Sequence, residues 1–161
     1  MGRLWADAPA NYVVHERRRG EKPPWESTSD MASINYFLLL VESRLRVDER
    51  SIVDIIANNE LTTGNHEFDH QAVGHVIFAH AVFHLCHILL NHLFPLRLHL
   101  PDLSDGAPPS FLSRALRIGA DHARKLASFL ADAAKSGCHV ASFYAYSSAV
   151  AGRVLLVHSL R

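Results

Sequence analysis

The chain has little cysteine and no net charge, and each absence excludes a class of protein. Cys86 and Cys138 are the two cysteines among its 161 residues, which excludes a disulfide framework and a zinc cluster held by several cysteines. Its 16 Lys and Arg residues balance 16 Asp and Glu residues, and a formal charge of zero argues against a surface that binds nucleic acid. We therefore expect two reduced thiols in an intracellular protein, with no direct contact between this segment and nucleic acid.

Several other signals are missing. The first ten residues lack a basic start and a sustained apolar run, so they are not typical of a signal sequence. Histidines and an asparagine interrupt the longest apolar stretch, residues 74–94, which argues against a membrane span. The sequence has no HExxH motif, nucleophile elbow, phosphate loop or Gly-rich dinucleotide turn. We therefore predict no catalytic residues, no cofactor and no contact with a membrane.

What is present is helical periodicity. Apolar residues recur at helical spacing over residues 30–46, over 113–135 after Pro108 and Pro109, and over 140–160. A fourth and longer helix starts near Glu67 and runs to residue 94, and a proline-rich loop follows it over residues 95–109. The pattern predicts an all-α helical bundle of about four main helices with a long proline-rich loop.

This organisation predicts one folded domain. We expect residues 1–25 to form a loop or a loosely ordered N-terminal segment, because they hold three prolines (Pro9, Pro23 and Pro24) and no helical period. Residues 26–161 form the helical domain. A chain of this length can bury roughly 70% of its unfolded surface, so it can fold around one core without a metal.

The long apolar helix carries the most informative residues. On a helical wheel, His80, His84, His87 and Asn91 fall in one narrow stripe, and apolar side chains occupy nearly all other directions. A helix this apolar is expected at the centre of a bundle. The stripe is then either a polar contact between packed helices or a face that binds a metal ion, and the first interpretation is preferred.

The metal interpretation remains as the alternative. Histidines four residues apart can bind one metal ion, and both His66 with His70 and His80 with His84 have that spacing. The run NHEFDH adds carboxylates beside the first pair. This alternative predicts a helical metal-binding protein or metalloenzyme whose ligands are His66, His70, His80 and His84, whereas the preferred interpretation predicts no metal ligands.

Four stretches, in order, carry a resemblance to a known family. KPPWESTSD at 22–30 is similar to a Pro-Pro-Trp segment that precedes the first amphipathic helix of that family. FAHAVFHLCHILLNHLF at 78–94 looks like its central histidine-rich helix. A loop at 95–109, an Ala-rich helix at 113–135 and the run SFYAYSSAVAGRVLLVHS at 142–159 follow in the same order. The chain therefore resembles the regulatory, or middle homology, region of fungal zinc-cluster transcription factors.

The resemblance implies a function without catalysis. The DNA-binding module of that family needs six cysteines, so the two cysteines of this chain cannot form it. The resemblance implies a nuclear regulatory domain, present as a fragment truncated at its C-terminal end, that acts in regulation of transcription through protein partners or a small effector. A truncated bundle would expose one flank of the 140–160 helix, so we also expect self-association or a missing partner.

Overall fold

The protein is an arrangement of α-helices, as the periodicity predicts. The computed structural model describes residues 22–45, 70–98, 107–137 and 142–159, with the backbone alone described at 45, 70, 71, 93–98 and 142. These residues form four helices, and no strand occurs among them: α2 (Asp30–Leu45), α4 (His70–Leu98), α5 (Pro109–Lys135) and α6 (Ser142–Ser159). The predicted all-α bundle is confirmed.

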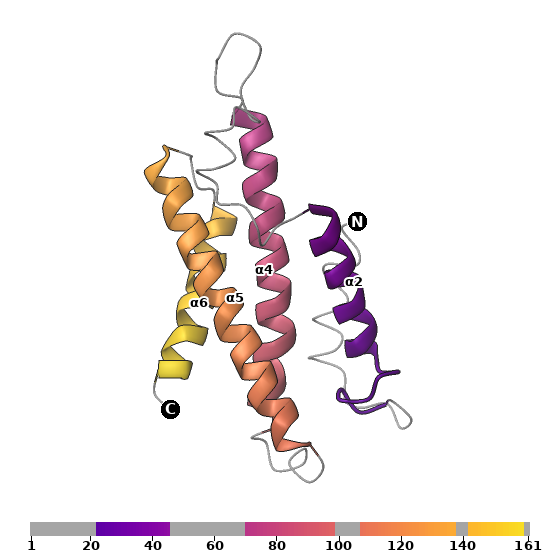
Figure 1. Ribbon diagram of the computed structural model, residues 1–161. Helices are drawn as coiled ribbons and strands as arrows, with labels where there is room; N and C mark the ends of the chain where they lie inside the picture. The colour runs from indigo at the N-terminus through magenta and orange to yellow at the C-terminus, as the bar shows by residue number, and fades with distance from the viewer. Residues whose placement is uncertain (1–21, 46–69, 99–106, 138–141, 160–161) are drawn as a thin grey trace.

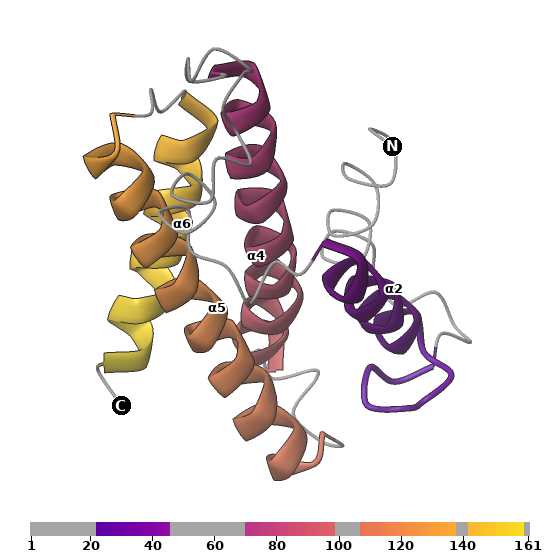
Figure 2. The same ribbon diagram turned by 45° about the horizontal axis from the view of Figure 1, so that its top comes forward.

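Helix α4 is the central element. It contacts α2, α5 and α6, and both ribbon views place α2 on one side of α4 and the other two helices on the opposite side (Figures 1 and 2). Ala81 and Ile88 of α4 are fully buried in the main core. The prediction that the histidine-rich apolar helix occupies the centre is therefore confirmed. Its predicted start near Glu67 lies outside the described residues.

Residues 72–92 of α4 are also long and apolar enough to cross a bilayer by length and composition. The core helix of a soluble protein meets the same criterion, and 56% of the most apolar stretch is buried inside the molecule. Buried histidines and an asparagine lie within it, and polar side chains of this kind are costly in hydrocarbon. The helical stretch is thus weak evidence for a membrane span.

Helix α5 is the most amphipathic helix, and its ends match the sequence signals. Pro109 is its first residue, where the missing N–H removes no helical hydrogen bond. At the other end Gly137 has φ of 79°, a left-handed conformation that glycine adopts without steric cost, and its N–H donates to the Ala134 carbonyl. Its buried face includes Ala115, Gly119, Ala120, Ala123, Leu126, Phe129, Leu130 and Ala133. The small side chains in this face let α5 approach α4 closely.

The run from 140 to 160 is apolar almost all round and includes small residues that permit close helix contact, which predicts a second central helix. Helix α6 differs from this prediction. Ala151 and Val154 are buried against the main core, and the Tyr144 hydroxyl donates to the Gly74 carbonyl of α4 at 3.5 Å. The opposite face, with Tyr146 and Leu156, is exposed. Small residues that we expected to permit close helix contact also lie on the exposed side, namely Ala145, Ser148, Ala149 and Gly152. That expectation was wrong, because α4 and α5 together cover one face of α6 alone.

Helix α2 is attached through a smaller cluster. Met31 and Leu38 pack with Leu90 of α4, and Phe111 of α5 contacts the same cluster. The Ser29 hydroxyl accepts a hydrogen bond from the Ala32 N–H at 3.2 Å, which caps the start of the helix. Four other large apolar side chains of α2 are exposed, namely Tyr36, Phe37, Leu39 and Leu40. Helix α2 is therefore less covered than its helical periodicity predicts.

Two segments beside the helices refine the predicted boundaries. Within the expected N-terminal loop, Trp25 contacts Phe111 edge to face at 5.9 Å between ring centroids. At the predicted loop after residue 94, α4 instead continues through Pro95 to Leu98. Pro95 lacks the N–H that would donate to the Asn91 carbonyl. The last turns of α4 remain helical without this one hydrogen bond. Residues 99–106 of the predicted loop lie outside the described residues.

Candidate functional site

The histidines of α4 lie at its contact with α5. His80, His84 and His87 are buried, with His84 2% exposed, and each contacts a ring on α5. The partners on α5 are Phe129 for His80 and His122 for the other two. We call His80, His84, His87 and His122 the histidine seam. The predicted polar contact between packed helices is therefore present.

The closest contact in the histidine seam joins two imidazole nitrogens. Nδ1 of His84 lies 2.9 Å from Nδ1 of His122, a hydrogen-bond distance. Such a bond needs an N–H on one ring and a lone pair on the other, so the two rings hold different tautomers. The pair can accept one further proton at a distant nitrogen. A second proton would place two N–H groups against each other, so this arrangement opposes full protonation.

Aromatic contacts complete the histidine seam. The rings of His87 and His122 stack with centroids 4.0 Å apart and planes 10° apart, and His80 stacks on Phe129 at 4.5 Å and 4°. Phe83 contacts His84, His87 and His122 through edge-to-face arrangements. Nδ1 of His80 and both ring nitrogens of His87 are buried from solvent. These stacks favour neutral imidazoles, because a charged ring buried against another ring loses its hydration.

The geometry of the histidine seam differs from that of a metal site. Two nitrogens bound to one tetrahedral zinc ion lie roughly 3.3 Å apart, further than the contact between His84 and His122. The stacked rings of His87 and His122 lie in nearly parallel planes, so their nitrogen lone pairs do not converge. Among the described residues, no group of three or more His, Cys, Asp or Glu side chains is placed to hold a metal ion.

The predicted metal alternative is tested only in part by these contacts. His80 and His84 lie in the described histidine seam, where they contact Phe129 and His122. His66 lies outside the described residues, and His70 is described by its backbone alone. The four-histidine site therefore stays a prediction.

Two other side chains with chemical potential lie in structural positions. Ser147 is fully buried, and its hydroxyl donates to the Phe143 carbonyl of its own helix at 2.9 Å. This contact indicates a packing role for Ser147 rather than that of a nucleophile. Burial raises the pKa of the Cys86 thiol from 9.0 to about 11, so the reactive thiolate is scarce at neutral pH. Cys138 lies outside the described residues.

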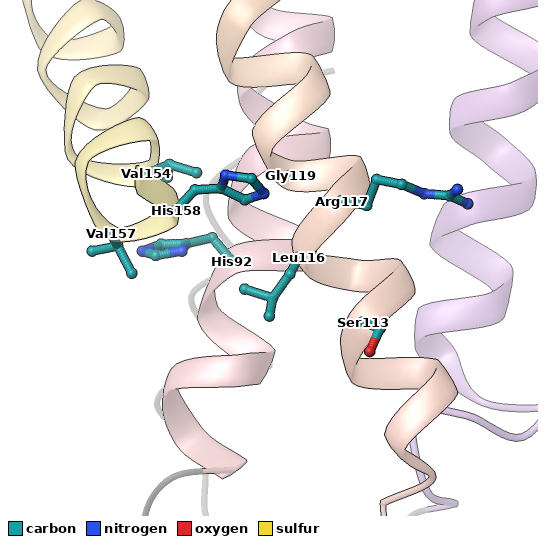
Figure 3. A pocket seen from close by; sticks show the side chains of 8 residues that line it. All are labelled: His92, Ser113, Leu116, Arg117, Gly119, Val154, Val157 and His158. Carbon is teal, nitrogen blue, oxygen red and sulfur yellow. The ribbon is translucent and has the colours of Figure 1, made fainter. Parts of the chain in front are cut away.

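A groove opens between α4, α5 and α6 near the C-terminal part of α4 (Figure 3). Its volume is about 420 Å³, within the size range of small-molecule sites. Eight of the described residues line it: His92, Ser113, Leu116, Arg117, Gly119, Val154, Val157 and His158. We call this the end groove.

Helix crossing shapes the end groove. A Cβ atom built on Gly119 would lie 3.6 Å from the Asn91 Cβ and 3.8 Å from the His92 backbone nitrogen. Glycine thus marks the point where α5 passes close to the α4 backbone. In the close view, His158 of α6 extends toward Gly119, and the His92 ring lies beside Val157. The two imidazoles therefore come from different helices and reach the same opening.

The electrostatic environment of the end groove is basic. His92 is buried, and its pKa is lowered first by burial and second by the positive charge of Arg153. None of the described residues that line the end groove is acidic. The guanidinium of Arg117 points away from the two histidines in the close view, so its charge is directed to the other side of α5. The positive charge near the His92 imidazole thus comes from Arg153.

Sequence reasoning identified one half of the histidine seam and missed the other. The stripe of His80, His84 and His87 was visible because the rest of α4 is apolar. His122 stands among charged neighbours in α5, but it follows the buried Gly119 by three residues and precedes the buried Leu126 by four. That spacing was the signal that could have placed it on the contact face. Asn91, the fourth residue of the stripe, donates to the His87 carbonyl at 2.8 Å within α4.

Comparisons with models of protein families, with curated proteins and with solved structures found no match to this chain. The resemblance to fungal zinc-cluster regulatory regions therefore stays a prediction.

Proposed function

We propose that this chain is a regulatory domain of the fungal zinc-cluster transcription-factor type, located in the nucleus, which responds to a small effector without catalysing a reaction. The observation that supports an effector is the end groove, because three different helices supply its walls. An occupant would contact all three at once. Its binding energy would therefore favour one packing arrangement of the bundle over others, which is the physical requirement for a ligand to change a domain's output.

The histidine seam supports the same proposal from the interior. The partly buried contact between His84 and His122 fixes the relative position of α4 and α5 through a directional bond. Apolar side chains could slide past one another at lower cost. The hydrogen bond therefore specifies how α4 and α5 pack, while the end groove stays open between α4, α5 and α6. A ligand that binds in the end groove can act on helices whose relative position is defined.

Protein partners form the second part of the proposal. Exposed large apolar side chains occur on α2 and on α6, including Phe37 and Leu39 of the former and Tyr146 and Leu156 of the latter. Apolar exposure of this kind is common where another protein binds. We propose that the domain passes its signal to other proteins through these helices, with no contact between this segment and nucleic acid.

A tethering experiment tests the regulatory function. The full chain is fused to an unrelated DNA-binding domain and reporter transcription is measured in a fungal cell, with the DNA-binding domain alone as the baseline. We expect the fusion to change reporter output, and Leu126→Asp, which places a charge in the fully buried core, to abolish the change. The control His75→Ala alters an exposed position of α4 and should behave as the parent chain. Output equal to the baseline from a folded, nuclear fusion would contradict the proposal.

A further inference from the structure

We propose that the end groove binds an organic anion with an apolar body, a carboxylate carried on a hydrocarbon chain. This inference rests on the proposed effector function and names the chemical class of its ligand. It follows from the distribution of polar and apolar groups around the end groove, which separates into two parts.

The apolar part accounts for the body of the ligand. Leu116 of α5 and Val154 and Val157 of α6 line the end groove, and in the close view the Leu116 side chain extends toward the His92 side of the opening (Figure 3). Branched aliphatic side chains offer dispersion contacts and no hydrogen bonds. A hydrocarbon chain gains free energy by leaving water for such a surface, whereas a polar body would lose hydration without compensation.

The polar part accounts for the head group. His92 and His158 line the end groove together with the apolar residues, and each imidazole can donate an N–H. A carboxylate can accept from two such donors at once. Arg153 adds positive charge close enough to act on His92. A cationic ligand would meet this positive charge, and none of the described lining residues is acidic to offset it. An anion is therefore the complementary partner.

The position of Arg117 limits where the head group lies. Although this residue lines the end groove, its guanidinium points away from the histidines in the close view. The site thus places the carboxylate between His92 and His158. Arg117 does not form a bidentate pair with the carboxylate, so we expect a moderate affinity for the ligand. That affinity should depend strongly on the two imidazoles.

Calorimetric titration of the full chain with octanoate and with octanamide tests the inference. The two compounds share the hydrocarbon chain and differ in charge, so the difference in affinity measures the head-group contribution. We expect octanoate to bind about tenfold more tightly, because charge-assisted hydrogen bonds are roughly twice as strong as neutral ones. Imidazole resonances of His92 and His158 should shift on addition of octanoate.

Variants locate the site. His158→Ala should weaken octanoate binding about tenfold and leave octanamide binding little changed, since it removes a donor and not the apolar wall. His158 is exposed, so the variant is expected to fold. Arg153→Gln should weaken octanoate binding more at low salt than at high salt. The matched control His75→Ala lies on α4 about 25 Å along the helix axis from His92 and should bind as the parent chain does.

The outcomes separate this inference from the proposed function. Equal binding of octanoate and octanamide, or octanoate binding unaffected by His158→Ala, would overturn the anion site. Absence of octanoate binding at millimolar concentration would overturn it too. If octanoate binds as expected and the tethered chain leaves transcription unchanged, the site stands and the regulatory function fails. If the tethered chain alters transcription and octanoate does not bind, the regulatory function stands and the anion site fails.

Discussion

Replacing the two hydrogen-bonded imidazoles singly and together should reveal the energetics of the histidine seam. The variants are His84→Leu, His122→Leu and the double variant. Leucine approximates the size of imidazole and has no hydrogen-bonding atom. Each single variant therefore removes one end of the 2.9 Å bond and leaves the other imidazole in place.

The structure predicts that the two single variants lose different amounts of unfolding free energy. His122→Leu leaves the polar Nδ1 of His84 in a site that is 2% exposed, where water cannot replace the lost bond, so we expect a loss of about 1–3 kcal/mol. His84→Leu leaves His122, which is half-buried and can bond to water, so the cost should fall near or below about 1 kcal/mol. The double variant removes both polar groups and should be less destabilised than the sum of the single variants, with a coupling of about 0.5–3 kcal/mol.

Urea unfolding followed by circular dichroism gives the three free energies. For a chain of this length, each kcal/mol corresponds to about 2–4 °C in melting temperature, so scanning calorimetry provides an independent check. His75→Leu serves as the matched control at an exposed position of α4 and should change stability by less than about 0.5 kcal/mol. Additive effects of the two seam substitutions, or equal losses of stability for both, would refute the reasoning about this hydrogen-bonded pair.

Four further outcomes are expected. Because burial lowers the pKa of His92, its contribution to stability is present above about pH 6.5 and is lost as the pH falls toward its lower folded-state pKa, so calorimetry should show a lower melting temperature at pH 5.5 than at pH 7.5. Gly119→Ala should stabilise the protein by about 0.5–1 kcal/mol in urea unfolding, since its Cβ meets ordinary contacts, whereas Gly137→Ala should cost about 1 kcal/mol at its positive φ. Native Cys86 should react with iodoacetamide at pH 8 about a hundredfold more slowly than in urea, by peptide mass spectrometry. Elemental analysis should find well below one equivalent of transition metal, and a full equivalent lost with His80→Ala would favour the metal alternative.

The fold was largely predictable because helical periodicity is a local property. The apolar face of α5, its proline start and its end at Gly137 followed from spacing and capping signals within one segment. The central position of α4 followed from its lack of a solvent-compatible face. Burial of His84 and His87 was predictable for the same reason, since a nearly all-apolar helix leaves them few directions toward water.

Features that depend on contacts between segments were harder to predict. His122 pairs with His84 from a distant part of the chain, and its charged neighbours obscured its position. The end groove brings His92 and His158 together through helix crossing, which residue spacing within either helix does not specify. The exposed small residues of α6 show the same limit. Gly152 is suited to close packing, yet among the described residues no atom would lie within 4 Å of a Cβ added there.

The most direct test of the account is nuclear magnetic resonance of the intact chain with ¹⁵N-labelled histidine. The account predicts a scalar coupling across the hydrogen bond between Nδ1 of His84 and Nδ1 of His122, with one nitrogen protonated and the other bearing a lone pair. Addition of zinc should leave these signals unchanged. Two histidines with no mutual coupling and the nitrogen shifts of solvent-exposed rings, or signals that move together onto a bound metal ion, would contradict the central claim that these imidazoles join two packed helices.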